Sequence, residues 1–84
     1  MDWEVVEARV VAPGLLTVRF ADGLEGRVRF EPTAYRGVFA PLRDPAFFAR
    51  LYVGGWFVTW PGEIDLAPDA MYDEIKKTGE CLLR

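Results

Sequence analysis

The residues of this sequence that could do chemistry are four carboxylates around a tight turn near its end. They are Glu63, Asp65, Asp69 and Asp73. Carboxylate oxygens bind divalent cations, and a pair of carboxylates can act as general acid and base. A metal-dependent enzyme is therefore one hypothesis. The spacing favours a simpler interpretation, in which one acid lies in the turn, one at a strand edge and two on a helix. It lacks the D-x-D-x-D-G order of a cation-binding loop. Asp69 and Asp73 also fall near the start of a predicted helix, where acids stabilise the helix dipole.

Other groups that commonly carry catalysis are missing. The sequence contains no histidine and no serine, which excludes Ser–His and Cys–His pairs and histidine metal ligands. No glycine-rich phosphate-binding loop is present. The one cysteine, Cys81, cannot form an internal disulfide and is expected to be an unreactive thiol. We therefore expect no catalytic residue, no metal site and no cofactor site, and predict that the protein is not an enzyme.

A second group of residues suggests protein binding. Arg19, Arg27 and Arg29 alternate with apolar residues and are expected on the outer face of a hairpin. Leu15 and Phe57 are expected on the same outer side, and arginine and aromatic side chains dominate interaction hot spots. These five residues form the predicted partner surface. The alternative is a solvated face on which the arginine stems cover the strands.

Charge and hydropathy narrow the function classes further. The chain has 10 Lys and Arg against 13 Asp and Glu, a net charge of −3. Without a basic run, nucleic acid is disfavoured as a direct partner. No stretch approaches the roughly 20 apolar residues of a membrane helix, so no membrane association is expected. The first residues, MDWEVVEARV, carry acids where a signal peptide would have basic residues. We expect a cytoplasmic protein.

The stretch from Gly14 to Phe30 is predicted to form a β-hairpin and to organise the fold. Apolar residues alternate with charged ones on both sides of Ala21-Asp22-Gly23. A three-residue loop with Gly23 at positive φ keeps every apolar residue on one face, whereas a two-residue loop does not. This register places Leu16 opposite Val28, Val18 opposite Gly26, and Arg19 opposite Glu25. Gly26 leaves a gap that a bulky neighbour should fill.

The remaining segments predict a small α+β domain. Trp3–Val11 is expected to pair with the hairpin as a three-stranded meander. The later expected elements are a helix starting at Asp44-Pro45, strands at Trp56–Trp60 and Ile64–Leu66, and a helix at Pro68–Thr78 with Met71, Tyr72 and Ile75 buried. The predicted fold is a small antiparallel sheet, the meander plus two short later strands, with two short helices packed on one face. Residues 1–84 are expected to form a single domain.

Three motifs along the chain resemble a known bacterial family. They are a hairpin V-x-F-x-D-G-x-x-G-x-V, the segment FAPLRDPAFF, and a W-P-G-x-x-D-L-x-P-D-x-x-Y end. Together they resemble domain of unknown function family 2442 over nearly the whole chain. The matching residues are Val18, Phe20, Asp22, Gly23, Gly26, Val28, Phe39, Leu42, Asp44, Phe47, Trp60, Gly62, Asp65, Leu66, Pro68, Asp69 and Tyr72.

The resemblance implies a small α+β protein encoded beside a second small protein, of domain-of-unknown-function family 4160, in a toxin–antitoxin arrangement. Some relatives append a helix-turn-helix DNA-binding domain, and this sequence contains none. The leading hypothesis is therefore a non-enzymatic protein-binding domain, an antitoxin-like or regulatory partner of the neighbouring small protein. The alternative is a homodimeric structural or ligand-binding module that pairs through a sheet edge.

Overall fold

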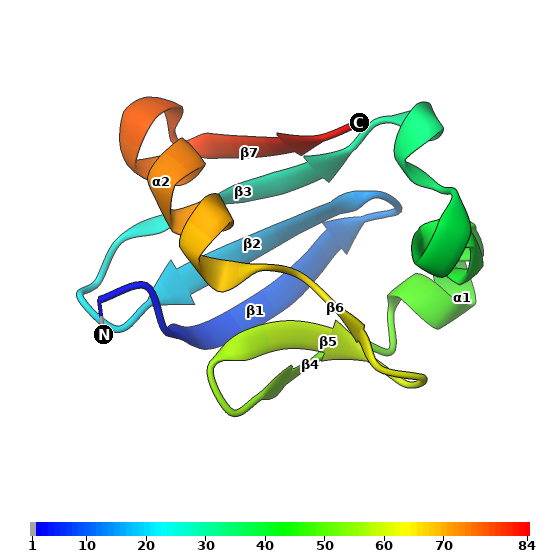
Figure 1. Ribbon diagram of the computed structural model, residues 1–84, viewed down its shortest axis with the longest axis horizontal. Helices are drawn as coiled ribbons and strands as arrows, with labels where there is room; N and C mark the ends of the chain where they lie inside the picture. Colours follow the sequence, from blue (N-terminus) through cyan, green and yellow to red (C-terminus); the bar gives the residue numbers. More distant parts are fainter. Residues whose placement is uncertain (1) are drawn as a thin grey trace.

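The computed structural model describes residues 2–84 and shows two small sheets that share one core (Figure 1). The first sheet, in the order β1-β2-β3-β7, contains β1 (Val5–Ala12), β2 (Leu15–Phe20), β3 (Glu25–Phe30) and β7 (Glu80–Leu83). The second contains β4 (Tyr52–Gly54), β5 (Phe57–Trp60) and β6 (Ile64–Asp65). The helices are α1 (Pro45–Phe48), α2 (Pro68–Thr78) and the 3-10 helices η1 (Pro32–Ala34) and η2 (Gly37–Arg43). No helix within residues 2–84 is long and apolar enough to cross a membrane.

The predicted meander and its register are confirmed. β2 pairs antiparallel with both β1 and β3, and Val18 lies opposite Gly26. The loop has three residues, and Gly23 adopts a φ of 93°, which a residue with a side chain rarely does. The Asp22 carboxylate accepts a hydrogen bond of 2.9 Å from the Leu24 N–H across this loop. The α+β class is confirmed with it.

Two strands, β4 and β7, were not predicted. β7 lies beside β3 and runs parallel to it, so the four-stranded sheet is mixed rather than purely antiparallel. The chain reaches β7 through α2, which ends at Gly79 with a φ of 84°. This pairing brings Cys81 against Val28, although the two residues are far apart in the sequence. A four-residue strand with a distant partner gives no pattern that its own sequence could reveal.

The core lies between the inner face of the four-stranded sheet, α2 and the second sheet (Figure 1). α2 has the predicted bounds, and Met71 and Ile75 are buried as expected, whereas Tyr72 is only half-buried. The gap at Gly26 is filled by Ile75, because a Cβ at position 26 would overlap the Ile75 side chain. The predicted bulky neighbour is therefore confirmed.

The other end of the core is closed by α1 and the second sheet. Asp44 caps α1 as predicted, since its carboxylate accepts a 3.0 Å hydrogen bond from the Ala46 N–H. Trp60 is fully buried and donates its indole N–H to the Phe48 carbonyl at 2.8 Å. Trp56 was expected in the same strand, on the face of Trp60. It lies instead in the two-residue loop between β4 and β5 and is 51% exposed.

A hydrogen bond joins the hairpin loop to α2. The Tyr72 hydroxyl donates to the Asp22 carboxylate at 2.5 Å, and the Tyr72 ring packs edge-on against Phe20. This bond lowers the pKa of Asp22 below its usual 3.8, with help from the Leu24 N–H. The same bond, together with desolvation, raises the pKa of Tyr72 from 10.0 to about 12.

Tyr72→Phe is therefore expected to lower thermal stability in a pH-dependent way. The lowered pKa of Asp22 means that its contribution is present above pH 3.8 and is lost as the pH falls through the folded-state value. The raised pKa of Tyr72 means that its contribution is present below pH 10.0 and is lost as the pH rises through about 12. Melting curves followed by circular dichroism should show the largest difference between wild type and variant in the neutral range. A constant difference from pH 3 to 12 would contradict this coupling.

Candidate protein-binding surface

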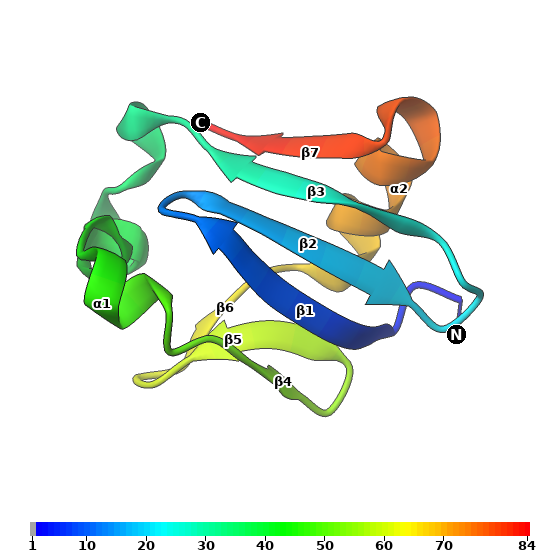
Figure 2. The same cartoon turned by 180° about the vertical axis from the view of Figure 1, so that it is seen from behind.

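The outer face of the four-stranded sheet is not covered by any other element of the described chain (Figure 2). Four of the five residues of the predicted partner surface lie on it, because they alternate with the buried residues of β2 and β3. We call this surface the arginine face. It comprises Glu7 and Arg9 of β1, Leu15, Thr17 and Arg19 of β2, Glu25, Arg27 and Arg29 of β3, and Glu80 and Leu82 of β7.

Three of the arginines on this face have acidic neighbours. Arg29 donates from Nε to Glu80 at 2.7 Å. The Glu7 carboxylate lies 3.7 Å from Arg9 and 3.8 Å from Arg19, so two guanidinium groups share one acid. Exposed pairs of this kind contribute only about 0–1 kcal/mol to stability. Glu7 and Glu80 therefore offset part of the positive charge of these three arginines.

Arg27 differs from the other arginines of this face. Its exposed side chain has no hydrogen bond or ion pair with any residue in the range 2–84. It borders a shallow hollow of about 440 Å³, whose lining includes Thr17, Glu25 and the two glycines 26 and 79. The Arg27 guanidinium group is therefore exposed beside a hollow and has no partner among residues 2–84.

Phe57, the fifth residue of the predicted surface, is placed elsewhere. It belongs to β5 of the second sheet, and β1 lies between that strand and β2 (Figure 2). Its ring contacts Trp56 edge-on, with 6.1 Å between the centroids. Leu15 and Phe57 therefore do not form one apolar patch. The predicted residues occupy two separate surfaces.

The four carboxylates considered as a metal site also separate. Glu63 and Asp65 line one hollow on the outer side of the second sheet. Asp69 and Asp73 lie on α2, where Asp69 accepts a 2.9 Å hydrogen bond from the Ala70 N–H. Within residues 2–84, no three Asp, Glu or Cys side chains gather as a group that could hold a metal ion.

The single thiol is directed into the core. Cys81 is 5% exposed and lies on the inner side of β7. Burial raises the pKa of the Cys81 thiol, and the nearby Glu74 carboxylate raises it further. A raised pKa keeps the thiol protonated at neutral pH, and the thiolate is the reactive form.

Tyr52 and Gly54 were not predicted as site residues. Both line the hollow that also contains Phe57, Glu63 and Asp65. A signal for them exists in the sequence. Gly54 and Gly55 separate two runs rich in β-branched and aromatic residues, a pattern typical of a hairpin.

Comparison with known proteins identifies a family. No curated protein and no solved structure matches the chain significantly. The family model described as "Protein of unknown function (DUF2442)" matches residues 5–77. That range begins at the first residue of β1 and extends almost to the end of α2. The resemblance carried by the sequence motifs is confirmed, and the chain belongs to the DUF2442 family.

Proposed function

We propose that this protein is a non-enzymatic protein-binding domain that docks through its arginine face on an acidic surface of a small partner protein. In this role it acts as an antitoxin-like or regulatory partner. The observation that carries the proposal is the exposed, unpaired guanidinium group of Arg27 on an otherwise uncovered sheet face. A guanidinium group pairs with a carboxylate through two parallel hydrogen bonds, which gives both direction and strength.

The composition of the arginine face fits an acidic partner better than a nucleic acid. It carries one more arginine than glutamate, on a chain whose net charge is −3. Glu7, Glu25 and Glu80 would repel a continuous phosphate backbone, whereas a protein can place its acids opposite individual arginines. Leu15 and Leu82, both half-buried, add apolar contact beside the charges.

The proposed mechanism is steric. A flat sheet face that covers the working surface of its partner blocks that surface without any reaction. The family resemblance suggests a partner encoded beside this protein. We propose that the complex forms in the cytoplasm, where a chain with one cysteine has no internal disulfide to lose to the reducing environment.

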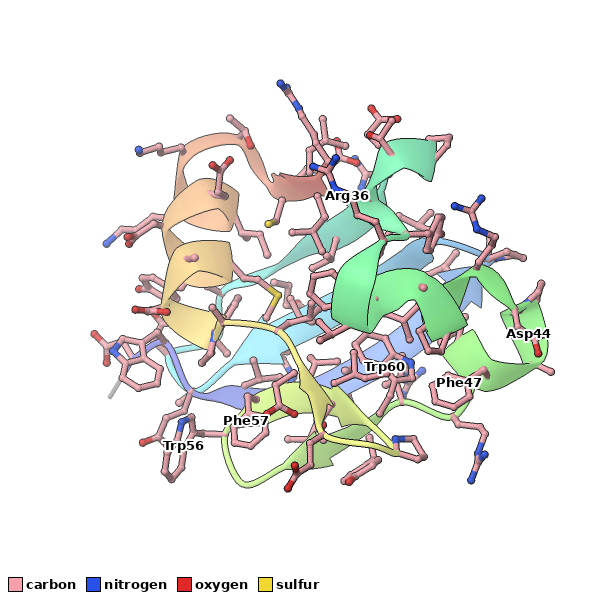
Figure 3. The ribbon with its side chains drawn as sticks, turned by 45° about the vertical axis from the view of Figure 1, so that its right-hand side comes forward. Arg36, Asp44, Phe47, Trp56, Phe57 and Trp60 are labelled. Atoms are coloured by element: carbon pink, nitrogen blue, oxygen red, sulfur yellow. The ribbon has the colours of Figure 1, made fainter. Side chains whose placement is uncertain are left out.

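Arg27→Glu is expected to weaken binding to the neighbouring small protein by at least about tenfold, because it puts a carboxylate opposite the partner's acids. The matched control is Arg36→Glu, which makes the same charge change at an exposed position between η1 and η2 (Figure 3). Isothermal titration calorimetry with the co-expressed and separated proteins measures both affinities. Unchanged melting temperatures show that each variant folds.

Equal affinity of the two variants would remove the arginine face as the docking surface. A stable dimer of the isolated chain that binds no neighbour would favour self-association instead. The exposed apolar side chains of β1 are the surface available for it, since Val6 is 47% and Val11 is 60% exposed. Light scattering of the isolated protein at several concentrations distinguishes these outcomes.

A further inference from the structure

A second surface feature lies on the outer side of the smaller sheet. It is a hollow of about 590 Å³ between two aromatic rings and two carboxylates. The rings come from β4 and β5, and the carboxylates come from β6 and the turn before it. The lining residues are Tyr52, Gly54, Phe57, Thr59, Glu63 and Asp65.

Gly54 keeps the space between the two rings open. It lies opposite Phe57 in the β4–β5 pair. A Cβ at this position would lie 3.5 Å from the Tyr52 ring, 3.8 Å from the Phe57 ring and 3.0 Å from the Thr59 methyl group. Any side chain at position 54 would therefore occupy the floor of the hollow. The absence of one leaves both rings accessible from the same side.

The two carboxylates of this hollow have no cationic partner in the described chain. Glu63 is exposed and makes no ion pair with residues 2–84. Asp65 accepts a short hydrogen bond from the hydroxyl of Thr59, which is 4% exposed and holds the carboxylate in place. No Lys or Arg is among the lining residues. Two negative charges therefore line the same hollow as two aromatic rings.

Elsewhere in this molecule, three half-buried aromatic rings lie beside the chain's own cations. Arg43 lies 5.3 Å from the centre of the Tyr35 ring, and Arg50 lies 5.7 Å from that of Phe47. Lys76 lies 5.6 Å from the centre of the Tyr72 ring. Within residues 2–84, the rings of this hollow have no such cation. A cation bound in this hollow would be attracted both by the rings and by the two carboxylates. The hollow is therefore a more favourable cation site than a ring alone.

We propose that this hollow binds a guanidinium or ammonium group, carried by an arginine or lysine side chain of a peptide or by a free polyamine. The cation would lie between the rings of Tyr52 and Phe57 and face Glu63 and Asp65. Trp56, 51% exposed and beside Phe57, extends the apolar wall for the methylene stem of such a ligand (Figure 3). The site lies on a different sheet from the arginine face. Either of the two proposals can therefore be wrong without affecting the other.

The test uses three probes with the intact, isotopically labelled protein. They are acetyl-Gly-Arg-Gly-amide, the same peptide with neutral citrulline in place of arginine, and spermidine. Backbone amide shifts should move within residues 52–65, and the arginine peptide should bind at least about fivefold more tightly than the citrulline peptide. Tighter binding of spermidine would identify the occupant as a free polyamine, and tighter binding of the arginine peptide would identify a protein segment.

Two variants test the geometry of the hollow. Glu63→Gln removes one charge at an exposed side chain, and Gly54→Ala places a methyl group between the rings. Each should weaken the binding of the arginine peptide by about threefold or more. Glu74→Gln, the same change at an exposed position of α2, should leave it unchanged. Equal binding of the arginine and citrulline peptides, or full affinity in Glu63→Gln, would overturn the proposal even if Gly54→Ala does not fold.

Discussion

Trp60→Ala is expected to destabilise the protein by about 4 kcal/mol, a large part of the total stability of a small domain. Trp60 is fully buried, and its ring lies 5.6 Å from that of Phe48 and 6.3 Å from that of Phe30, measured between centroids. It also bonds the Phe48 carbonyl at 2.8 Å. The substitution leaves a cavity and an unpaired carbonyl at the junction of the second sheet and α1. Urea denaturation followed by circular dichroism measures the loss.

Two further tryptophan substitutions separate the sources of this effect. Trp60→Phe keeps most of the apolar volume but removes the donor, and it should cost about 2 kcal/mol. Trp56→Ala makes the same truncation at a half-exposed loop residue and should cost clearly less, about 1 kcal/mol or below. A loss at Trp56 equal to that at Trp60 would contradict the assignment of Trp60 as the central core residue.

Gly26→Ala is expected to cost about 2–3 kcal/mol, although it adds only one methyl group. That methyl would overlap the Ile75 side chain and lie 2.9 Å from the Gly79 carbonyl oxygen. The Gly79 oxygen cannot easily move, because it accepts a 3.1 Å hydrogen bond from the Arg27 N–H. The strand and α2 must therefore separate. The same urea denaturation measures this loss.

The matched test for Gly26 is a double-mutant cycle with Ile75→Ala. Removing the Ile75 branches vacates part of the space that the new methyl needs. The two changes together should therefore cost less than the sum of the single changes, by about 1 kcal/mol. Strict additivity would show that Gly26 and Ile75 are not in contact. The Gly79 oxygen remains in place, so full recovery is not expected.

The sequence predicts the parts of this fold that depend on local chemistry. The hairpin register follows from the alternation around Asp22 and Gly23, and the bounds of α2 follow from Pro68 and Gly79. Four residues of the arginine face were predicted because they follow directly from that register, namely Leu15, Arg19, Arg27 and Arg29. Their exposure on an uncovered face depends on the remaining elements packing on the opposite side of the sheet.

The parts of the fold and of the candidate sites that could not be predicted depend on contacts between segments that are far apart in the sequence. Alternation within β5 shows which residues share a face with Phe57, but not which sheet the strand joins. The hollow proposed to bind a cation needs β4, β5 and β6 together, and β4 has only three residues. The parallel pairing of β7 likewise depends on the return of the chain after α2. No local sequence pattern predicts these contacts between distant segments.

The role of the arginine face is tested most directly by hydroxyl-radical footprinting of this protein, alone and in complex with the small protein encoded beside it. Leu15 and Leu82 lie on the face, whereas Trp56 and Val38 are exposed elsewhere, at 51% and 70%. We predict that Leu15 and Leu82 lose reactivity in the complex while Trp56 and Val38 keep theirs. Protection of Trp56 or Val38 with Leu15 and Leu82 unchanged would contradict the account, as would the absence of any complex.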